Sequence, residues 1–147
     1  MLKPQALQKY SLFSGLTEDQ VRDIIPFMQQ ESYAPEEAII TEGKANDKIF
    51  FIIEGNVAVI KRDAELARFG EGEAFGEMEV LDIMPAAASI KSLSSVSAMS
   101  MSNKAMREIY KMDAKAFSLI IMNLARNLSR RLRKMDEVLA DSPPVFY

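Results

Sequence analysis

Residues 75–90 read Phe-Gly-Glu-Met-Glu-Val-Leu-Asp-Ile-Met-Pro-Ala-Ala-Ala-Ser-Ile and are the most informative stretch of the sequence. Its second residue, Gly76, has no Cβ, so the backbone there can approach a neighbouring group closely. Gly70 and Gly72 mark turns just before the stretch, and residues 88–90 at its end fit a strand. The stretch therefore lies within a series of strands and turns, and we refer to residues 75–90 as the cassette.

The region around the cassette, from Ala38 to Met101, has the apolar spacing of short strands separated by turns. Glu54-Gly55 and Arg62-Asp63 mark two of these turns. The strands predicted in this way lie at 39–40, 49–53, 57–60, 66–69, 88–90 and 96–101. Short strands with a turn about every 8–12 residues favour a β-sandwich or a jelly-roll barrel.

A helix is predicted before the strands. Thr17 can accept a hydrogen bond from the amide of Gln20, whose side chain can reach back, as in a capping box. Leu16 and Val21 are placed to form a hydrophobic staple across this helix start. Pro26 lies inside the helical pattern and is expected to kink or shorten the helix.

Helical spacing returns after the strands. Asn103 is the predicted N-cap of a helix that ends near Met112, and a longer helix follows at 116–140. Apolar residues repeat along the long helix at alternating spacings of four and three, which is typical of a seam between paired helices. This seam consists of Ile121, Ala125, Leu128, Leu132, Met135 and Leu139. We expect one domain, residues 1–140, that dimerises through helix 116–140, followed by a flexible tail at 141–147. The alternative is that the long helix packs its apolar stripe on the barrel of its own chain.

The composition indicates a globular protein without thiol or imidazole chemistry. Of the 147 residues, 48% are hydrophobic and 27% are charged, and the net charge is −3. Cys and His are absent, which excludes disulfides, thiolate zinc sites, histidine-ligated haem, and Ser-His-Asp or Cys-His catalysis. No apolar run could span a membrane, and no secretory signal is recognisable. We therefore expect a cytoplasmic protein that is not an enzyme, since no other acid–base or nucleophile constellation stands out.

The cassette resembles the phosphate-binding cassette of the cyclic-nucleotide-binding domain family, which includes catabolite-activator-type regulators and kinase regulatory subunits. The family pattern is Phe-Gly-Glu, a short helix, and then Pro-Arg-Ala-Ala-Ser/Thr-Val. Three further segments, at 12–16, 42–55 and 69–77, are similar to the family in order and spacing. The resemblance extends from about Leu12 to Leu139. It implies an antiparallel jelly-roll barrel of eight strands, with an N-terminal helix and a long C-terminal helix.

The resemblance also implies a pocket for cyclic AMP or cyclic GMP at the cassette. Glu77 would accept a hydrogen bond from the ribose 2′-hydroxyl, and the amide of Ala87 would face the cyclic phosphate. Backbone amides at the start of a short helix suit an anion, because they are unpaired and the helix dipole favours negative charge. The candidate pocket residues are Phe75, Gly76, Glu77, Met78, Ala86, Ala87 and Ser89. A simpler interpretation of Glu77 is a carboxylate that interacts only with the helix dipole.

Ala86 stands where the family has the arginine that holds the phosphate. Loss of one partner of a buried charge pair costs roughly 2–5 kcal/mol, and each ~1.4 kcal/mol is a factor of ten in affinity. A pocket that binds at about 1 μM would weaken to roughly 30 μM or into the millimolar range. Lys91 and Arg68 are candidates for a replacement cation because they are close in sequence.

In the regulator branch of the family, the long helix pairs two subunits and covers the ligand with a Thr/Ser pair. The corresponding residues here are Met135 and Asp136. The regulators continue into a helix-turn-helix domain, and the sequence up to Tyr147 leaves no room for one, so we expect no DNA binding in the family's manner. A basic cluster on the helix is interpreted as its solvated face. This cluster consists of Arg126, Arg130, Arg131, Arg133 and Lys134.

Two functions are consistent with these features. The first is a stand-alone sensor or regulatory module, in which ligand entry shifts the C-terminal helix and a second subunit or an effector protein reads the shift. The second is an interaction module with a degenerate pocket, plugged by side chains such as Met78 or Met135. A minor third possibility is contact with nucleic acid or a membrane through the basic cluster.

Overall fold

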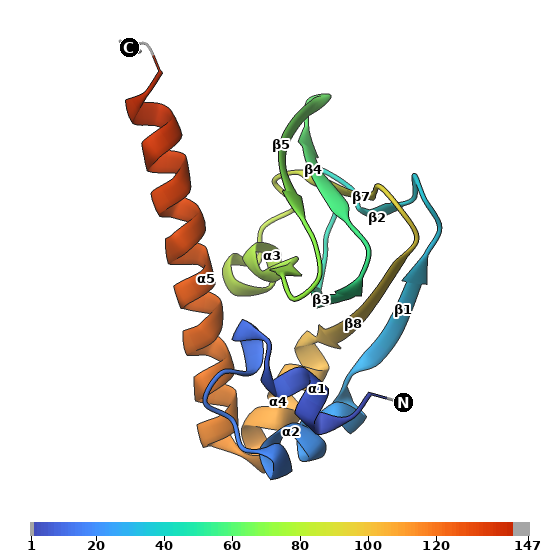
Figure 1. Ribbon diagram of the computed structural model, residues 1–147, viewed down its shortest axis with the longest axis vertical. Coiled ribbons are helices and arrows are strands. Elements are labelled where there is room, and N and C mark those ends of the chain that lie inside the picture. Colours follow the sequence, from blue (N-terminus) through green and yellow to red (C-terminus); the bar gives the residue numbers. More distant parts are fainter. Residues whose placement is uncertain (1, 143–147) are drawn as a thin grey trace.

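The computed structural model describes residues 2–142 as two β-sheets packed face to face, with short helices at one end and a long helix alongside (Figure 1). The sheets have the strand orders β1-β8-β3-β6 and β2-β7-β4-β5, and all pairings are antiparallel. The strands are β1 (Gln29–Tyr33), β2 (Ala38–Ile40), β3 (Lys48–Glu54), β4 (Val57–Lys61), β5 (Ala64–Phe69), β6 (Ala74–Phe75), β7 (Ser89–Ser92) and β8 (Val96–Ser102). The predicted jelly-roll class is confirmed.

The central strand β3 shows how the sequence builds two cores. Successive side chains of a strand point to opposite faces of the sheet. Phe50 and Ile52 point between the two sheets, where Phe50 stacks on Phe75 with ring centroids 4.9 Å apart. Ile49 and Phe51 point the other way, into the core that the sheet shares with the helices. The apolar run at 49–53 is thus continuous because both faces of this strand are buried.

The helices gather at the open end of the sandwich and along one side (Figure 1). They are α1 (Pro4–Gln8), α2 (Glu18–Ile24), α3 (Glu77–Asp82), α4 (Asn103–Met112) and α5 (Ala114–Ala140), with 3-10 turns η1 (Ser11–Phe13) and η2 (Ile25–Phe27). Of the predicted tail at 141–147, residues 143–147 lie outside the described part of the chain. No helix within residues 2–142 combines the length and apolar character that crossing a membrane requires.

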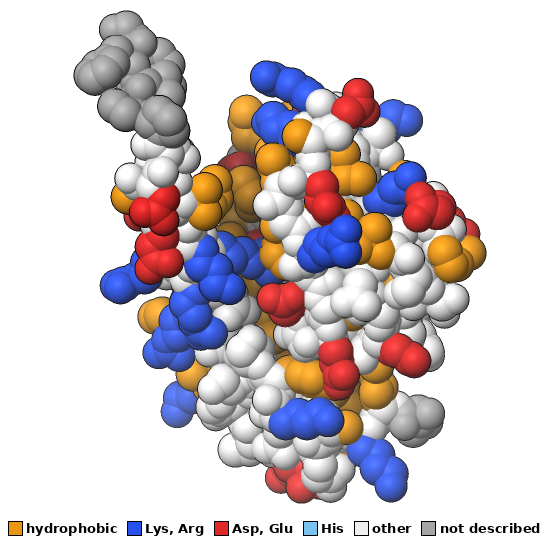
Figure 2. All heavy atoms as spheres, turned by 45° about the horizontal axis from the view of Figure 1, so that its top comes forward, with side chains coloured by type: hydrophobic (Ala, Val, Ile, Leu, Met, Phe, Trp, Pro, Cys, Tyr) orange, Lys and Arg blue, Asp and Glu red, His pale blue; other side chains and the backbone are white. Residues whose placement is uncertain are grey.

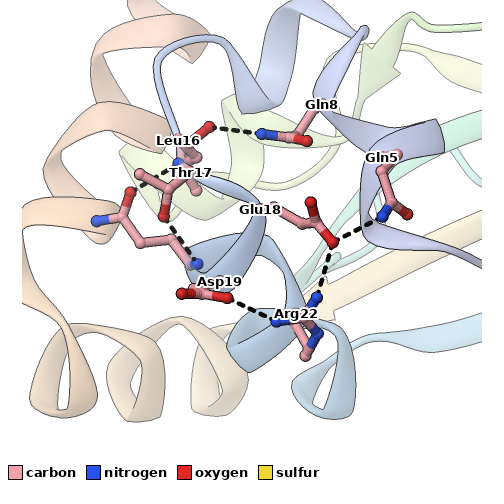
Figure 3. Close-up of polar contacts among 8 residues, drawn as sticks. Gln5, Gln8, Leu16, Thr17, Glu18, Asp19 and Arg22 are labelled. Atoms are coloured by element: carbon pink, nitrogen blue, oxygen red, sulfur yellow. Dashed lines mark hydrogen bonds and ion pairs between the residues drawn. The ribbon is translucent and has the colours of Figure 1, made fainter.

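The predicted capping box at the start of α2 is confirmed (Figure 3). The hydroxyl of Thr17 accepts from the amide of Gln20 at 3.1 Å, and the side-chain oxygen of Gln20 accepts from the amide of Thr17 at 3.0 Å. The α-helix ends at Ile24, and the turn that contains Pro26 is a 3-10 helix. Proline therefore shortens the helix as expected, because it cannot donate a backbone hydrogen bond.

The N-terminal ends of α4 and α5 differ from the prediction by one or two residues. Ser102, rather than Asn103, is the N-cap of α4, since its hydroxyl accepts from the amide of Ala105 at 3.1 Å. Asp113 caps α5 in the same way, by accepting from the amide of Ala116 at 3.0 Å. The long helix therefore begins at Ala114, two residues before the predicted start.

A buried amide fixes the first half of α5. Asn123 has only 2% of its surface exposed, and its Nδ2 donates to the carbonyl oxygens of Leu12 and Ser14, each at 2.9 Å. A buried amide needs such partners to offset its desolvation. Asn123 therefore ties α5 to the segment that enters the domain.

Candidate functional site

The cassette begins at the tight turn between β6 and α3. Gly76 is the N-cap of α3 and has φ 85°, in the left-handed region that other residues disfavour. A Cβ on Gly76 would lie 2.6 Å from the carbonyl oxygen of Lys48 and 3.0 Å from Nδ2 of Asn46. Glycine is required here both by the backbone conformation and by the lack of space.

Asn46 holds this turn from the segment before β3. Its Nδ2 donates to the carbonyl oxygens of Lys48, at 2.9 Å, and Gly76, at 3.2 Å. Its Oδ1 accepts from the amide of Lys48 at 3.2 Å. No local sequence pattern singles out Asn46, because the turn that it supports lies 30 residues further along the chain.

Glu77, the first residue of α3, forms an ion pair with the long helix. Only 3% of Glu77 is exposed, and its Oε1 accepts from Nη1 of Arg131 at 2.6 Å. The same guanidinium donates to the carbonyl oxygen of Ala74. It also lies over the ring of Phe69, with Cζ 4.1 Å from the ring centroid. These contacts join the start of the cassette directly to α5.

The two carboxylates of the first turn of α3 are shifted toward the protonated form. Burial raises the pKa of Glu77 above its ordinary value, and the nearby Arg131 charge opposes this rise. Burial also raises the pKa of Glu79; a hydrogen bond from Asn46 opposes the rise, and the charge of Glu77 adds to it. The site thus combines a buried acceptor with a forked guanidinium donor, which suits a polar ligand that carries hydroxyl groups.

Arg131 differs from the rest of the basic cluster. The other four members are exposed, as predicted, whereas 27% of the Arg131 side chain is exposed and its head group points inward. A signal for this lies in the helix itself, because Arg131 continues the spacing of the buried residues Ile120 and Leu124. Helical periodicity alone would have placed Arg131 on the inner face.

The second part of the cassette is organised by backbone hydrogen bonds. The amide of Ala86 donates to the carbonyl oxygen of Lys44, and the carbonyl oxygen of Ala86 accepts from the amide of Gly43, each at 2.9 Å. The Ala86 side chain is buried in the core between the sheets. Ser89 is also engaged, since its hydroxyl accepts from the amide of Glu42 at 2.9 Å. Ala87 is exposed and so leaves its surface open to a ligand.

Several other candidate residues occupy different places from those expected. Phe75 is a core residue, with 1% of its surface exposed. Met78 and Met135 are both exposed, so neither of them plugs a pocket. Lys91 pairs with Glu36 at 2.7 Å, and Arg68 pairs with Glu65 at 2.6 Å. Both candidate replacement cations are therefore engaged in ion pairs.

The apolar stripe of α5 is only partly covered. Ile121 and Leu128 are partly buried, whereas Ala125 is exposed. Leu132, Met135 and Leu139 are each more than 60% exposed. Figure 2 shows apolar side chains around the hollow between the free end of α5 and the sandwich. Within residues 2–142, the barrel does not cover the second half of the stripe, so packing of the stripe on its own barrel is limited to the first half.

Two open cavities of about 440 Å³ each lie outside the Glu77–Arg131 contact. One is bordered by the ends of β1, β3 and β8, including Tyr33, Glu54 and Ser95. The other lies beside α3 and is bordered by α4 and α5. Neither is lined by Glu77, Ala86 or Ala87.

Comparison with known proteins agrees with this arrangement. Residues 30–113 match the family model described as cyclic nucleotide-binding domain. The cyclic AMP receptor protein of Thermus thermophilus is 28% identical over 130 residues, which cover 85% of this chain and 58% of the receptor. A CRP-like cAMP-activated global transcriptional regulator of Mycobacterium tuberculosis is 27% identical over 142 residues, which cover 93% of this chain and 62% of the regulator. The chain thus spans less than two thirds of the length of either relative.

Solved structures share the fold over most of the chain. A cyclic nucleotide-binding domain from Methylobacillus flagellatus has a TM-score of 0.86 at 24% identity and covers 99% of this chain and 85% of its own. The catabolite activator protein of Thermus thermophilus has a TM-score of 0.76 at 26% identity and covers 88% of this chain and 62% of its own. Since the family model matches more than half of the chain and the fold agrees with it, the protein belongs to the cyclic nucleotide-binding domain family.

Proposed function

We propose that this chain is a regulatory domain that binds a small polar ligand, cyclic AMP or cyclic GMP, at the cassette and signals through α5. The observation that carries the proposal is the 2.6 Å ion pair between Glu77 and Arg131. A ligand hydroxyl that donates to Glu77 must share this carboxylate with Arg131. Binding would therefore change the contact that holds the second half of α5 to the cassette.

The choice of ligand rests on the family and on the hydrogen-bonding groups of the site. The names of the Thermus and Mycobacterium relatives refer to cyclic AMP. Glu77 offers a buried acceptor for a ribose hydroxyl, and the exposed position of Ala87 leaves room for a phosphate beside it. Because Ala86 supplies no cation, we expect the affinity to be weak, in the range of roughly 30 μM to millimolar.

The output of such a domain would be read from α5. We propose that the exposed seam residues Leu132, Met135 and Leu139 pair with a second copy of the chain or with an effector protein. A regulatory rather than catalytic role, a single domain over residues 1–140 and a cytoplasmic location all belong to this proposal.

A second candidate function is a ligand-free interaction module. Two observations favour it: Ala86 is buried in the core at the arginine position, and Glu77 already has a partner in Arg131. In this case the domain would be retained for its α5 surface. The distinction between the two functions is whether a cyclic nucleotide binds at all.

Calorimetric titration with cyclic AMP and cyclic GMP tests the proposal. We expect saturable binding by the natural chain, and a loss of about tenfold to a hundredfold in affinity for Glu77→Ala, since a hydrogen bond to a charged group contributes roughly 1.5–3 kcal/mol. Glu79→Gln is the matched control, because it removes a neighbouring carboxylate of α3 that does not contact Arg131. Absence of binding by the natural chain at millimolar nucleotide would favour the interaction module.

A further inference from the structure

A second cavity beside the cassette has the features of a ligand site. Its volume is about 440 Å³, within the range of roughly 300–1,000 Å³ that is usual for small-molecule pockets. Its apolar walls come from three helices: Val80 and Leu81 of α3, Met106 of α4, and Phe117 and Ile121 of α5. Leu81 is 48% exposed, so apolar surface in this cavity faces water. Covering such surface contributes favourable free energy to binding.

The rim of the cavity carries polar groups without partners. Asn103 and Arg107 lie one turn apart on α4 and both line the cavity. Among the contacts formed by residues 2–142, neither side chain has a hydrogen bond or an ion pair. A guanidinium presents a planar fork of donors that matches a carboxylate, and the Asn103 amide can add a further donor.

We propose that this cavity binds an amphipathic carboxylate of the fatty-acid class, with the carboxylate on Arg107 and the acyl chain between α3 and α5. The apolar side chains of the three helices match an acyl chain, and the guanidinium at the rim matches its carboxylate. The positive charge at the rim selects an anionic head group over a neutral or cationic one.

The position of the cavity would connect this ligand to the cassette. Leu81 lies one turn after Glu77 on α3, and Ile121 lies on the same helix as Arg131. An acyl chain between Leu81 and Ile121 would hold α3 against α5. The cavity would thus control the same two helices as the Glu77–Arg131 pair, from a separate site.

The test is a titration of the whole chain with decanoate, without nucleotide, followed by NMR of ¹³C-methyl-labelled methionine. The Met106 methyl lines the cavity and should shift in a saturable manner. Arg107→Ala should weaken binding about tenfold or more, since it removes a charge-assisted hydrogen bond. Lys104→Ala is the control, because Lys104 is an exposed cation of α4 that does not line the cavity. Decanol should bind equally to the natural chain and to Arg107→Ala.

The proposal is overturned if decanoate gives no saturable shift of Met106, or if Arg107→Ala and Lys104→Ala weaken binding equally. The absence of a Met106 shift is also the result expected if the cavity accepts only a protein partner. Because nucleotide is left out, failure here leaves the titration with cyclic nucleotides unaffected.

Discussion

Replacement of Arg131 by alanine should destabilise the domain, and the loss should depend on pH. The substitution leaves the carboxylate of Glu77 buried without its cation. Breaking a buried pair in this way costs roughly 3–5 kcal/mol. We expect about 3 kcal/mol at pH 8, at the lower end of this range, because 27% of the Arg131 side chain is exposed and water can partly compensate.

The pH dependence follows from the direction of the Glu77 pKa. Because burial raises this pKa in the folded chain, the folded state binds the proton more tightly than the unfolded state. The stability that this provides is present at low pH and is lost as the pH rises through the folded pKa. Arg131 opposes the rise in pKa, so its removal raises the pKa further. At pH 5 Glu77 can take up a proton, and only about 1 kcal/mol should be lost, from the Phe69 and Ala74 contacts.

Urea unfolding followed by circular dichroism, at pH 5 and pH 8 and at one protein concentration, measures both values. Arg130→Ala is the matched control, since Arg130 is exposed at the preceding position of α5 and should change stability by less than about 0.5 kcal/mol. Arg131→Lys keeps the positive charge but loses the forked guanidinium, so its loss of stability should lie between those of Arg131→Ala and Arg130→Ala. A loss below about 1 kcal/mol at pH 8, or an equal loss at both pH values, would show that Arg131 does not compensate a buried charge on Glu77.

Three further predictions concern the supports of the site and the seam. Asn123→Ala should cost about 2 kcal/mol, because the carbonyls of Leu12 and Ser14 lose their buried donor; urea unfolding measures this, and a cost below about 0.5 kcal/mol would contradict it. Thr17→Ala should cost about 1 kcal/mol through loss of the capping box, and Thr17→Ser should restore most of it in the same assay. Leu132→Glu should convert a dimer to a monomer in sedimentation velocity without changing the circular dichroism spectrum; a natural chain that sediments as a monomer would remove the basis for this prediction.

The strands with a buried face were predictable, and the polar or very short ones were not. The run at 49–53 is apolar throughout because β3 is buried on both faces. β1 consists of Gln29–Tyr33 and lacks a hydrophobic pattern, since it lies at the edge of its sheet, beside β8. β6 has only two residues, Ala74–Phe75, and no periodicity can be read from so short a segment. The eight strands were expected from the family resemblance rather than from these patterns.

The sequence predicted the role of Gly76 in the candidate site, but it did not predict which charged side chains contact the cassette. Gly76 has the positive φ and close contacts that its lack of Cβ suggests. Helical spacing places Arg131 on the inner face of α5, but its contact with Glu77 depends on how α5 crosses the cassette, which no local pattern specifies. Similarly, Lys91 and Arg68 are near the cassette in sequence, and their ion pairs with Glu36 and Glu65 could not be predicted from that proximity.

In the proposed function, a ligand at the cassette is coupled to α5 through Glu77 and Arg131. Amide hydrogen exchange over residues 125–140, with and without saturating cyclic nucleotide, measures this coupling. We expect the nucleotide to change exchange in this half of α5 severalfold in the natural chain, and Arg131→Lys to reduce the change while nucleotide still binds. Nucleotide that binds at the cassette and leaves exchange in α5 unaltered would contradict this coupling.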